Sequence, residues 1–476
     1  MTDLNKPNLT RIHAFKDDVL ADHDATELSK LLKNKEIDIN EVLTSTIQRA
    51  QSINPSLNAI AAEKFDSVLK QKYVLNDSFF SGIPIFIKDN LDLSGFPTQH
   101  GCNAFQSNIK SKNSKITQQI LDSGFIGLGK SVLPEFGLNA STEFQQASPT
   151  RNPWQLNYSC GASSGGAAAL VAAGVIPIAH ANDGGGSIRI PAANCGLVGL
   201  KPTRGRLRPN ESASVLPINI ISDGVVTRSV RDTAHFYAEM EQQFYNPKLP
   251  KIGLMQHAAQ KRLRVAVVND SIQGQTDQET QAVVMHTAQL LANHGHHIEA
   301  FKLPIPDSFV ADFSHYWGLL AFMLQHGGSG LFGHSFNAQQ LDPLTLGLSQ
   351  LYRKNFYRTP AFLYRLKKIQ QIYRNIFQHY DVILSPVLAH VSPLLGELSP
   401  QQPFEQLFER LQNYVTFTPI QNIAGAPAIS LPMGQTQQHP RPIGIQLSAD
   451  LGQEALLLSL ALELEQLQPF ARIDQS

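Results

Sequence analysis

Apolar and polar residues follow two patterns along this chain, one typical of buried strands and one typical of helices. Short unbroken apolar runs, such as residues 84–88 (PIFIK), are typical of strands that are buried on both faces. Between the runs at 263–270 and 296–304, apolar residues recur with helical spacing through 280–295. Strands that alternate with helices predict an α/β protein with a central mixed β-sheet covered by helices on both faces.

Capping residues and glycines mark the ends of further elements. Asp24 and Asp38 each precede a helix-spaced apolar segment, and Gly124 and Gly174 each follow a short predicted helix. The other predicted elements are strands at 125–131, 175–182, 380–390, 426–434 and 442–449, and a closing helix at 453–468. No repeat is visible in the sequence, and we expect residues 1–476 to form a single domain.

Residues 305–380 differ from the rest of the chain because they are helical, aromatic and basic in pattern. We expect them to form a helical insertion or cap on the sheet. In the second half of this region, Thr359 and Pro360 are a typical helix start. The apolar stripe that follows consists of Leu366, Ile369, Ile372, Tyr373 and Ile376. This stripe predicts a helix that faces the core, and the alternative is a surface that docks on a membrane.

Composition narrows the class of protein. Hydrophobic residues make up 42% of the chain and charged residues 16%, which is typical of a large globular protein. Lys plus Arg and Asp plus Glu both total 39, so a nucleic-acid partner is not expected. The cysteines, Cys102, Cys160 and Cys195, lack the spacing of a metal site or disulfide framework and are interpreted as free, buried thiols. Residues 1–18 lack the apolar core of a signal peptide, which favours a cytoplasmic protein.

Three short motifs suggest functions that their surroundings argue against. Residues 124–131 match the phosphate-loop pattern, but Pro134 follows where the required helix would begin. Residues 161–165 match the nucleophile elbow of α/β-hydrolases, but no apolar strand precedes them. The histidines at 294–297 are interpreted as a helix end followed by a strand, whose adjacent side chains point to opposite faces. We therefore predict no nucleotide site, no hydrolase elbow and no metal site here.

The strongest chemical signal lies at 182–196, where Gly184, Gly185 and Gly186 run directly into Ser187. Each glycine costs backbone entropy, about 0.5–1 kcal/mol relative to alanine. Consecutive backbone N–H groups without side chains can converge on a developing negative charge. We therefore expect this loop to present N–H groups to an oxyanion and Ser187 to act as the nucleophile.

A serine nucleophile needs a base, and Lys88 at the end of the apolar run is the candidate. None of the 16 histidines lies in a recognisable triad motif. The ordinary lysine pKa of ~10.4 is too high for a base at neutral pH. Burial lowers the pKa, whereas the neighbouring Asp89 would raise it. A three-unit decrease takes on the order of 4 kcal/mol, which a desolvated site can supply.

Six stretches then occur in a fixed order between residues 80 and 450. They read IPIFIKDNLDLSGFPTQHG, GKSVLPEFG, CGASSGGAAALVAAG, NDGGGSIRIPAANCGLVGLKPTRGR, DGVVTRSVRD and FTPIQNIAGAPAISLP. Through them the chain resembles the amidase signature family, the Ser–Ser–Lys amide hydrolases. Among its members, the chain is most similar to general amidases and nylon-oligomer hydrolases. The resemblance implies the amidase signature fold and hydrolysis of a carboxylic amide bond without a cofactor.

The resemblance also assigns roles to individual residues. It implies that Ser187 forms the acyl-enzyme, that Lys88 is the base, and that Ser163 relays protons between them. It further implies a cis peptide bond between Ala162 and Ser163. The oxyanion would be held by the backbone amides of Gly184, Gly185, Gly186 and Ser187.

Three further residues are expected to support this site. Asp183 and Arg189 are expected to pair and hold the loop. Ser164 is expected to cap the following helix or to lie just behind the reacting groups. Cys160 and Cys195 are interpreted as packing residues.

Two alternatives stay within the same family. One is the catalytic subunit of a tRNA-dependent amidotransferase, and the other is a lipid-amide hydrolase acting at membranes. A scaffold that has lost activity is disfavoured, because Lys88, Ser163 and Ser187 are all present. We expect a small-molecule amide substrate shaped by the 305–380 region, no nucleic-acid partner and a possible homodimer. Membrane contact stays open.

Overall fold

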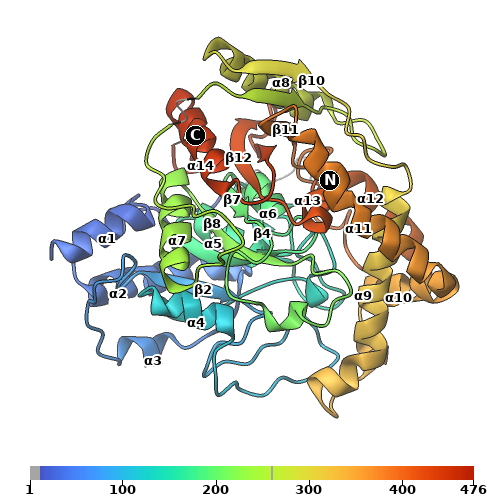
Figure 1. Cartoon of the computed structure of the whole chain (residues 1–476). Helices are drawn as coiled ribbons and strands as arrows, with labels where there is room; N and C mark the ends of the chain where they lie inside the picture. Colours follow the sequence, from blue (N-terminus) through green and yellow to red (C-terminus); the bar gives the residue numbers. More distant parts are fainter. Residues whose placement is uncertain (1–10, 259–260, 476) are drawn as a thin grey trace, which may run out of the picture.

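An eight-stranded mixed sheet runs through the middle of the molecule (Figure 1). The computed structural model describes residues 11–258 and 261–475. In sheet order, the strands are β10 (His297–Ala300), β9 (Arg264–Val267), β11 (Val382–Pro386), β13 (Pro442–Ser448), β12 (Ala428–Gln435), β7 (Val198–Lys201), β8 (Ser222–Thr227) and β6 (Ile178–Asp183). The β10–β9–β11 pairs are parallel and the remaining pairs antiparallel, which confirms the predicted mixed α/β sheet.

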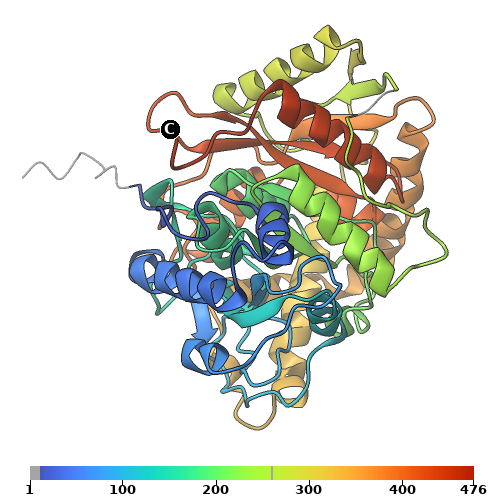
Figure 2. The same ribbon diagram turned by 90° about the vertical axis from the view of Figure 1, so that its left-hand side faces the viewer.

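Alternate strand residues distinguish the two faces of this sheet. Val265 and Val267 of β9 belong to one core cluster together with residues of α8, whereas Ala266 belongs to another with residues of α11. On the first face, α14 (Glu454–Leu467) contacts both α7 (Val230–Gln243) and α8 (Gln278–Asn293), and Figure 2 shows the three side by side. The second face is covered by α6 (Arg189–Cys195), α11 (Thr359–Ile376) and α13 (Pro419–Ala424).

A smaller sheet lies against the β6 edge of the large one. It consists of β1 (Ile60–Glu63), β3 (Ile126–Ser131) and β2 (Pro84–Lys88), in that order. All five side chains of β2 are buried, as its apolar run predicts. Because β2 packs beside β6, the end of β2 lies next to the strand that leads into the glycine loop.

The other elements surround these two sheets. Around the small sheet lie α1 (Ala25–Lys33), α2 (Ile39–Leu57), α3 (Phe65–Leu69), α4 (Lys115–Asp122) and the short helix η1 (Glu135–Gly137). The remainder are β4 (Arg151–Asn152), β5 (Gln155–Ser159), α5 (Gly165–Ala172), η2 (Glu211–Ala213) and α12 (Phe404–Tyr414). Asp24 and Asp38 are the N-caps of α1 and α2, as predicted, and each accepts a backbone N–H of the first turn.

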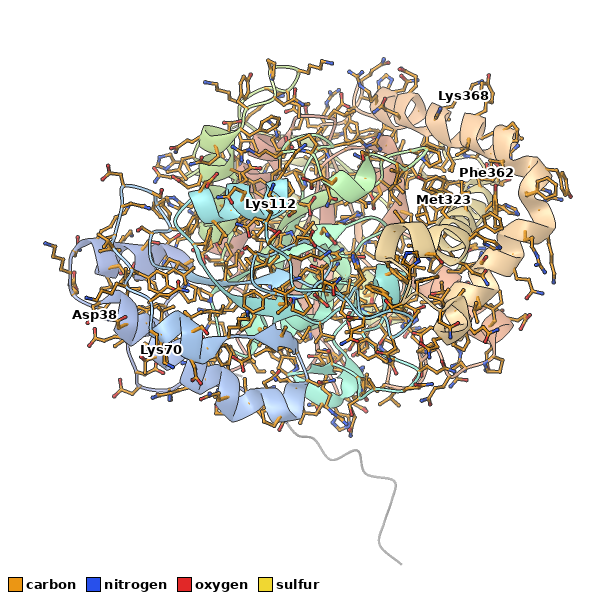
Figure 3. The ribbon with its side chains drawn as sticks, turned by 90° about the horizontal axis from the view of Figure 1, so that it is seen from below. Asp38, Lys70, Lys112, Met323, Phe362 and Lys368 are labelled. Atoms are coloured by element: carbon orange, nitrogen blue, oxygen red, sulfur yellow. The ribbon has the colours of Figure 1, made fainter. Side chains whose placement is uncertain are left out.

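The 305–380 region is helical, as expected, and lies along one side of the molecule (Figures 1 and 3). Its elements are α9 (Phe309–Phe332), η3 (Ala338–Gln340), α10 (Pro343–Asn355), η4 (Phe356–Arg358) and α11. The predicted helix start at Thr359 is confirmed. Four of the five stripe residues, Leu366, Ile369, Tyr373 and Ile376, are buried in the core, and Ile372 is half-buried against it. That the chain forms a single domain stays a prediction.

Two of the three misleading motifs have structural roles, and the third, at 161–165, is described with the active site. Lys130, in the phosphate-loop-like motif, lies in β3 and forms a buried ion pair with Asp89 at 3.0 Å. Its strand conformation excludes the helix that a phosphate loop requires. Among the histidines, His294 ends α8, Gly295 has the left-handed conformation (φ +87°), and His297 begins β10, as expected.

Two further absences concern the described residues only. In the ranges 11–258 and 261–475, no helix is long and apolar enough to cross a membrane. In the same part of the chain, no three His, Cys, Asp or Glu side chains are grouped so that they could hold a metal ion. The first ten residues of the polar start at 1–18 lie outside the described residues.

Candidate active site

The ammonium group of Lys88 lies at the end of β2 among hydrogen-bond acceptors. Its Nζ donates to Oγ of Ser163 at 2.8 Å and to Oγ of Ser164 at 2.9 Å. On the other side it approaches Oδ1 of Asn182 at 2.8 Å and the Asn182 carbonyl oxygen at 3.3 Å. The contact between β2 and β6 therefore brings together a lysine and an asparagine that are 94 residues apart in the sequence.

The charge of Lys88 is destabilised by its surroundings. The side chain is fully buried, and burial lowers its pKa to about 7, although the carboxylates of Asp183 and Asp223 raise it. A lysine with this pKa is partly neutral at pH 7, and its free lone pair can accept a proton. Burial therefore lowers the pKa of this side chain in the direction expected from the apolar run at 84–88.

His180 binds the backbone at the end of β2. Its Nδ1 accepts the backbone N–H of Lys88 at 3.2 Å, and its Nε2 lies 3.4 Å from Oδ1 of Asp223. Because Nδ1 is an acceptor, the ring proton is on Nε2 and points to the carboxylate. Burial lowers the pKa of His180, which favours the neutral ring. Sequence reasoning did not single out this histidine.

A reciprocal pair of side-chain amides orients Asn182. Nδ2 of Asn182 donates to Oδ1 of Asn90 at 3.0 Å, and Nδ2 of Asn90 donates back to Oδ1 of Asn182 at 3.2 Å. This pair turns Oδ1 of Asn182 toward Lys88. Neither asparagine was predicted as a site residue, although each lies within two positions of one (Lys88 or Asp183).

The serines at 163 and 164 lie between a bend and the start of α5. The peptide bond between Ala162 and Ser163 is cis, as the resemblance implies, and Gly161 has a φ of +77°. Ser164 is at the N-cap of α5, but its side chain accepts no backbone N–H there, so capping, the first of its two expected roles, is not observed. Its hydroxyl instead lies against Lys88 and donates to the Asn182 carbonyl oxygen at 3.3 Å.

Asp183 and Arg189 form a buried ion pair beneath the glycine loop. Nε of Arg189 lies 2.9 Å from Oδ2 of Asp183, and both side chains are fully buried. Burial alone would raise the pKa of the Asp183 carboxyl, but Arg189 holds it well below its usual range. Arg189 also donates to side-chain oxygens of Gln421, Gln446 and Asn422. The pair therefore connects the loop to α13 and β13.

The glycine loop is held through a backbone N–H and a backbone carbonyl oxygen. The N–H of Gly186 donates to Oδ1 of Asp183 at 2.7 Å, so this amide is already engaged inside the protein. The carbonyl oxygen of Gly185 accepts the Thr418 hydroxyl at 2.6 Å. Among the described residues, none accepts a hydrogen bond from the N–H of Gly184, Gly185 or Ser187.

A cavity of about 710 Å³ opens above this loop. Ser163, Gly184, Gly185 and Ser187 all line it, so the predicted nucleophile and relay face the same space. In the described part of the chain, the hydroxyl of Ser187 forms no hydrogen bond. Much of the wall is apolar, including Phe309, Phe313, Trp317, Leu320, Met323 and Leu324 of α9. Within the 305–380 region, which was expected to shape the substrate site, α9 lines the cavity, whereas α11 packs into the core as its apolar stripe predicts.

Comparison with known proteins identifies the family. The family model Amidase matches residues 41–458, which is most of the chain. The chain belongs to the amidase signature family. It is 45% identical over 469 residues to a putative amidase, AmiC, from Mycobacterium tuberculosis (strain ATCC 25618 / H37Rv), covering 98% of each chain. It is 30% identical to the 6-aminohexanoate-cyclic-dimer hydrolase of Paenarthrobacter ureafaciens, covering 94% of this chain and 95% of the relative.

A solved structure supports the same placement. The structure of 6-aminohexanoate cyclic dimer hydrolase complexed with substrate has a TM-score of 0.84 and 28% identity, covering 94% of this chain and 97% of that one. The chain is accordingly an amidase, a hydrolase of carbon–nitrogen bonds in amides, with the fold of amidase signature enzymes. The Lys88, Ser163 and Ser187 assignments stay predictions at this point.

Proposed function

We propose that this amidase cleaves its substrate through an acyl-enzyme on Ser187, with Lys88 as base and Ser163 as relay. The observation that carries the proposal is the 2.8 Å contact between Nζ of Lys88 and Oγ of Ser163, beside the cavity that Ser187 also lines. A buried lysine with a pKa of about 7 can take a proton from a serine hydroxyl near neutral pH. This is the chemistry that the family resemblance implies.

In the first half-reaction, Oγ of Ser187 attacks the carbonyl carbon of the amide. Its proton passes to Ser163 as the proton of Ser163 passes to the neutral Lys88. This relay requires Oγ of Ser187 to come within hydrogen-bond distance of Ser163 when substrate is bound. When the carbon–nitrogen bond breaks, the proton returns through Ser163 to the leaving amine. Water then attacks the acyl-enzyme by the same relay and releases the acid.

The oxyanion would be held by the backbone amides of Gly184, Gly185 and Ser187. These N–H groups have no acceptor among the described residues, whereas the N–H of Gly186 is bound to Asp183. We therefore narrow the predicted set of four donors to three. Loss of one such donor typically costs about 10²–10³ in turnover.

The cavity favours a small amide that carries an apolar group. Aromatic and aliphatic side chains of α9 form one wall, and the loop with Ser187 forms the floor. A cavity of about 710 Å³ is within the range that holds small organic ligands. Among the described residues that line the cavity, none favours the transferase or the lipid-amide alternative over hydrolysis of a small amide.

Intact mass after incubation with a fluorophosphonate tests this proposal. We expect one adduct on the wild type, none on Ser187→Ala and none on Lys88→Ala. Ser164→Ala is the matched control, because this hydroxyl also contacts Lys88 but is assigned no covalent role. We expect it to retain the adduct. An adduct on Ser187→Ala would place the nucleophile elsewhere, and a labelled Lys88→Ala would remove the lysine from the mechanism.

A further inference from the structure

Exposed aromatic side chains are concentrated at the junction between α10 and α11. Phe356 and Tyr357 are each 64% exposed and Tyr364 is 60% exposed. In the described part of the chain, Tyr245 is the only other exposed Phe, Tyr or Trp side chain. Three large rings within nine residues are therefore left in water, whereas every other described Phe, Tyr or Trp except Tyr245 is buried or half-buried. This concentration indicates that the surface meets a partner.

The same surface is basic. Between Asp342 and Asp381 there are seven Lys or Arg residues and no Asp or Glu, although the whole chain has no net charge. Two of the seven are paired, Arg365 with Asp312 and Arg374 with Asp450. The other five are Arg353, Lys354, Arg358, Lys367 and Lys368. Within residues 11–258 and 261–475, none of these five has a carboxylate within 4.0 Å.

The rings and the cations share one face. On α11, Tyr364, Lys367 and Lys368 lie opposite the buried side of the helix, to which both Phe362 and the apolar stripe belong. Nζ of Lys368 lies 4.3 Å from the Tyr364 ring centroid, and the Arg358 guanidinium lies 5.7 Å from that of Tyr357. Figure 3 shows Lys368 on the outer side of this end of the molecule. We call this surface the aromatic–basic patch: Phe356, Tyr357, Arg358, Tyr364, Lys367 and Lys368.

We propose that the aromatic–basic patch docks the enzyme on the surface of an anionic lipid bilayer. Basic side chains bind the acidic headgroups, while exposed rings insert at the boundary between headgroups and acyl chains. A second copy of the chain is disfavoured, because a two-fold contact would place the same cations against each other. Single-stranded nucleic acid also binds surfaces made of cations and aromatic rings, so the test below includes it.

Docking at this surface would place the enzyme beside a source of apolar amides. The patch is the outer layer of the wall whose inner helix, α9, lines the cavity, because α10 and α11 both pack against α9. The docking itself does not depend on which residues carry out catalysis. Its failure and that of the proposed mechanism are therefore separable.

Co-sedimentation of the full chain with vesicles tests the proposal. We expect binding to phosphatidylserine–phosphatidylcholine vesicles at low salt, loss of that binding in high salt, and no binding to pure phosphatidylcholine. In Arg358→Gln/Lys367→Gln/Lys368→Gln we expect an affinity lower by on the order of a hundredfold, from about fivefold per charge. Phe356→Ser should weaken binding without changing its salt dependence.

Matched controls make the result specific. Lys70→Gln/Lys72→Gln removes two exposed lysines at the other end of the molecule, where Figure 3 labels Lys70, and should bind as the wild type does. All variants should hydrolyse a water-soluble amide at the wild-type rate. Wild type that stays in the supernatant with anionic vesicles overturns the proposal. An equal loss of vesicle binding in Lys70→Gln/Lys72→Gln also overturns it. The same holds for a change in oligomeric mass that depends on the patch, and for tighter binding to single-stranded RNA than to vesicles at physiological salt.

Discussion

Replacing Lys88 with methionine should change how stability depends on pH as well as abolish activity. The lysine pKa falls from its ordinary value of 10.5 to about 7 on folding. Between these values the unfolded chain binds more protons than the folded one, so the free energy of unfolding rises with pH. Between pH 7 and pH 9 this single group contributes about 2 kcal/mol of that rise, by linkage from those two pKa values.

Stability at a single pH would not reveal this effect. Methionine removes the cost of burying a charge, but it also removes the donor that Ser163 and Asn182 share. Each acceptor left without a donor costs about 1–3 kcal/mol, which is as large as the gain. The effect of Lys88 is therefore isolated by taking the difference in free energy of unfolding between the wild type and Lys88→Met. That difference at pH 9 is compared with the same difference at pH 7.

Urea unfolding at the two pH values measures this quantity. Between pH 7 and pH 9, the free energy of unfolding should rise by about 2 kcal/mol more in the wild type than in Lys88→Met. Burial also lowers the pKa of Lys201 to about 7, but Lys201 is present in both proteins, so its contribution cancels. The exposed variant Lys70→Met serves as the control and should follow the wild type. Parallel pH profiles for wild type and Lys88→Met would refute the assignment of Lys88 as a buried lysine with a depressed pKa.

Three further changes test the surroundings of the site. Asp183→Asn leaves the buried guanidinium of Arg189 unpaired. Urea unfolding should show a free energy of unfolding lower by about 3–5 kcal/mol. An unchanged urea midpoint would mean that the pair is solvated. Asn90→Ala removes the amide that orients Asn182, so kcat should fall while KM changes little, and a change confined to KM would contradict this role. Phe313→Ala removes a ring from the apolar wall and so enlarges the cavity. The ratio of kcat/KM for amides with bulky apolar groups to kcat/KM for acetamide should therefore rise.

The predictable part of the fold was local in sequence. The run at 84–88 is short and apolar up to Lys88, is followed by Asp89, and forms β2 with those bounds. The β-α-β unit from Arg264 to Ala300 likewise followed from apolar spacing. Strand order was not accessible in this way, because buried strands have similar patterns. Nothing in the residues of β13 indicates that it pairs with both β11 and β12.

The site was predictable only in part, for the same reason. Lys88 and Ser163 are 75 residues apart, and it was the family resemblance, not their spacing, that joined them. The Asn90–Asn182 pair depends on two strands from different sheets lying side by side, which no local pattern contains. The segments that form α9 and α11 are both aromatic, and only packing decides that one lines the cavity and the other fills the core.

The three glycines before Ser187 look equivalent in sequence, but the structure separates them. Gly186 has a φ of +133°, and a Cβ there would lie 2.4 Å from Oγ1 of Thr418, which holds the Gly185 carbonyl. A Cβ on Gly185 or Gly184 would meet nothing closer than 3.5 Å. Gly186→Ala should therefore lose fluorophosphonate labelling, whereas Gly185→Ala should keep it and slow only bulky substrates. Equal loss in both would mean that close approach of the substrate to the backbone, and not the conformation of one residue, requires glycine in this loop.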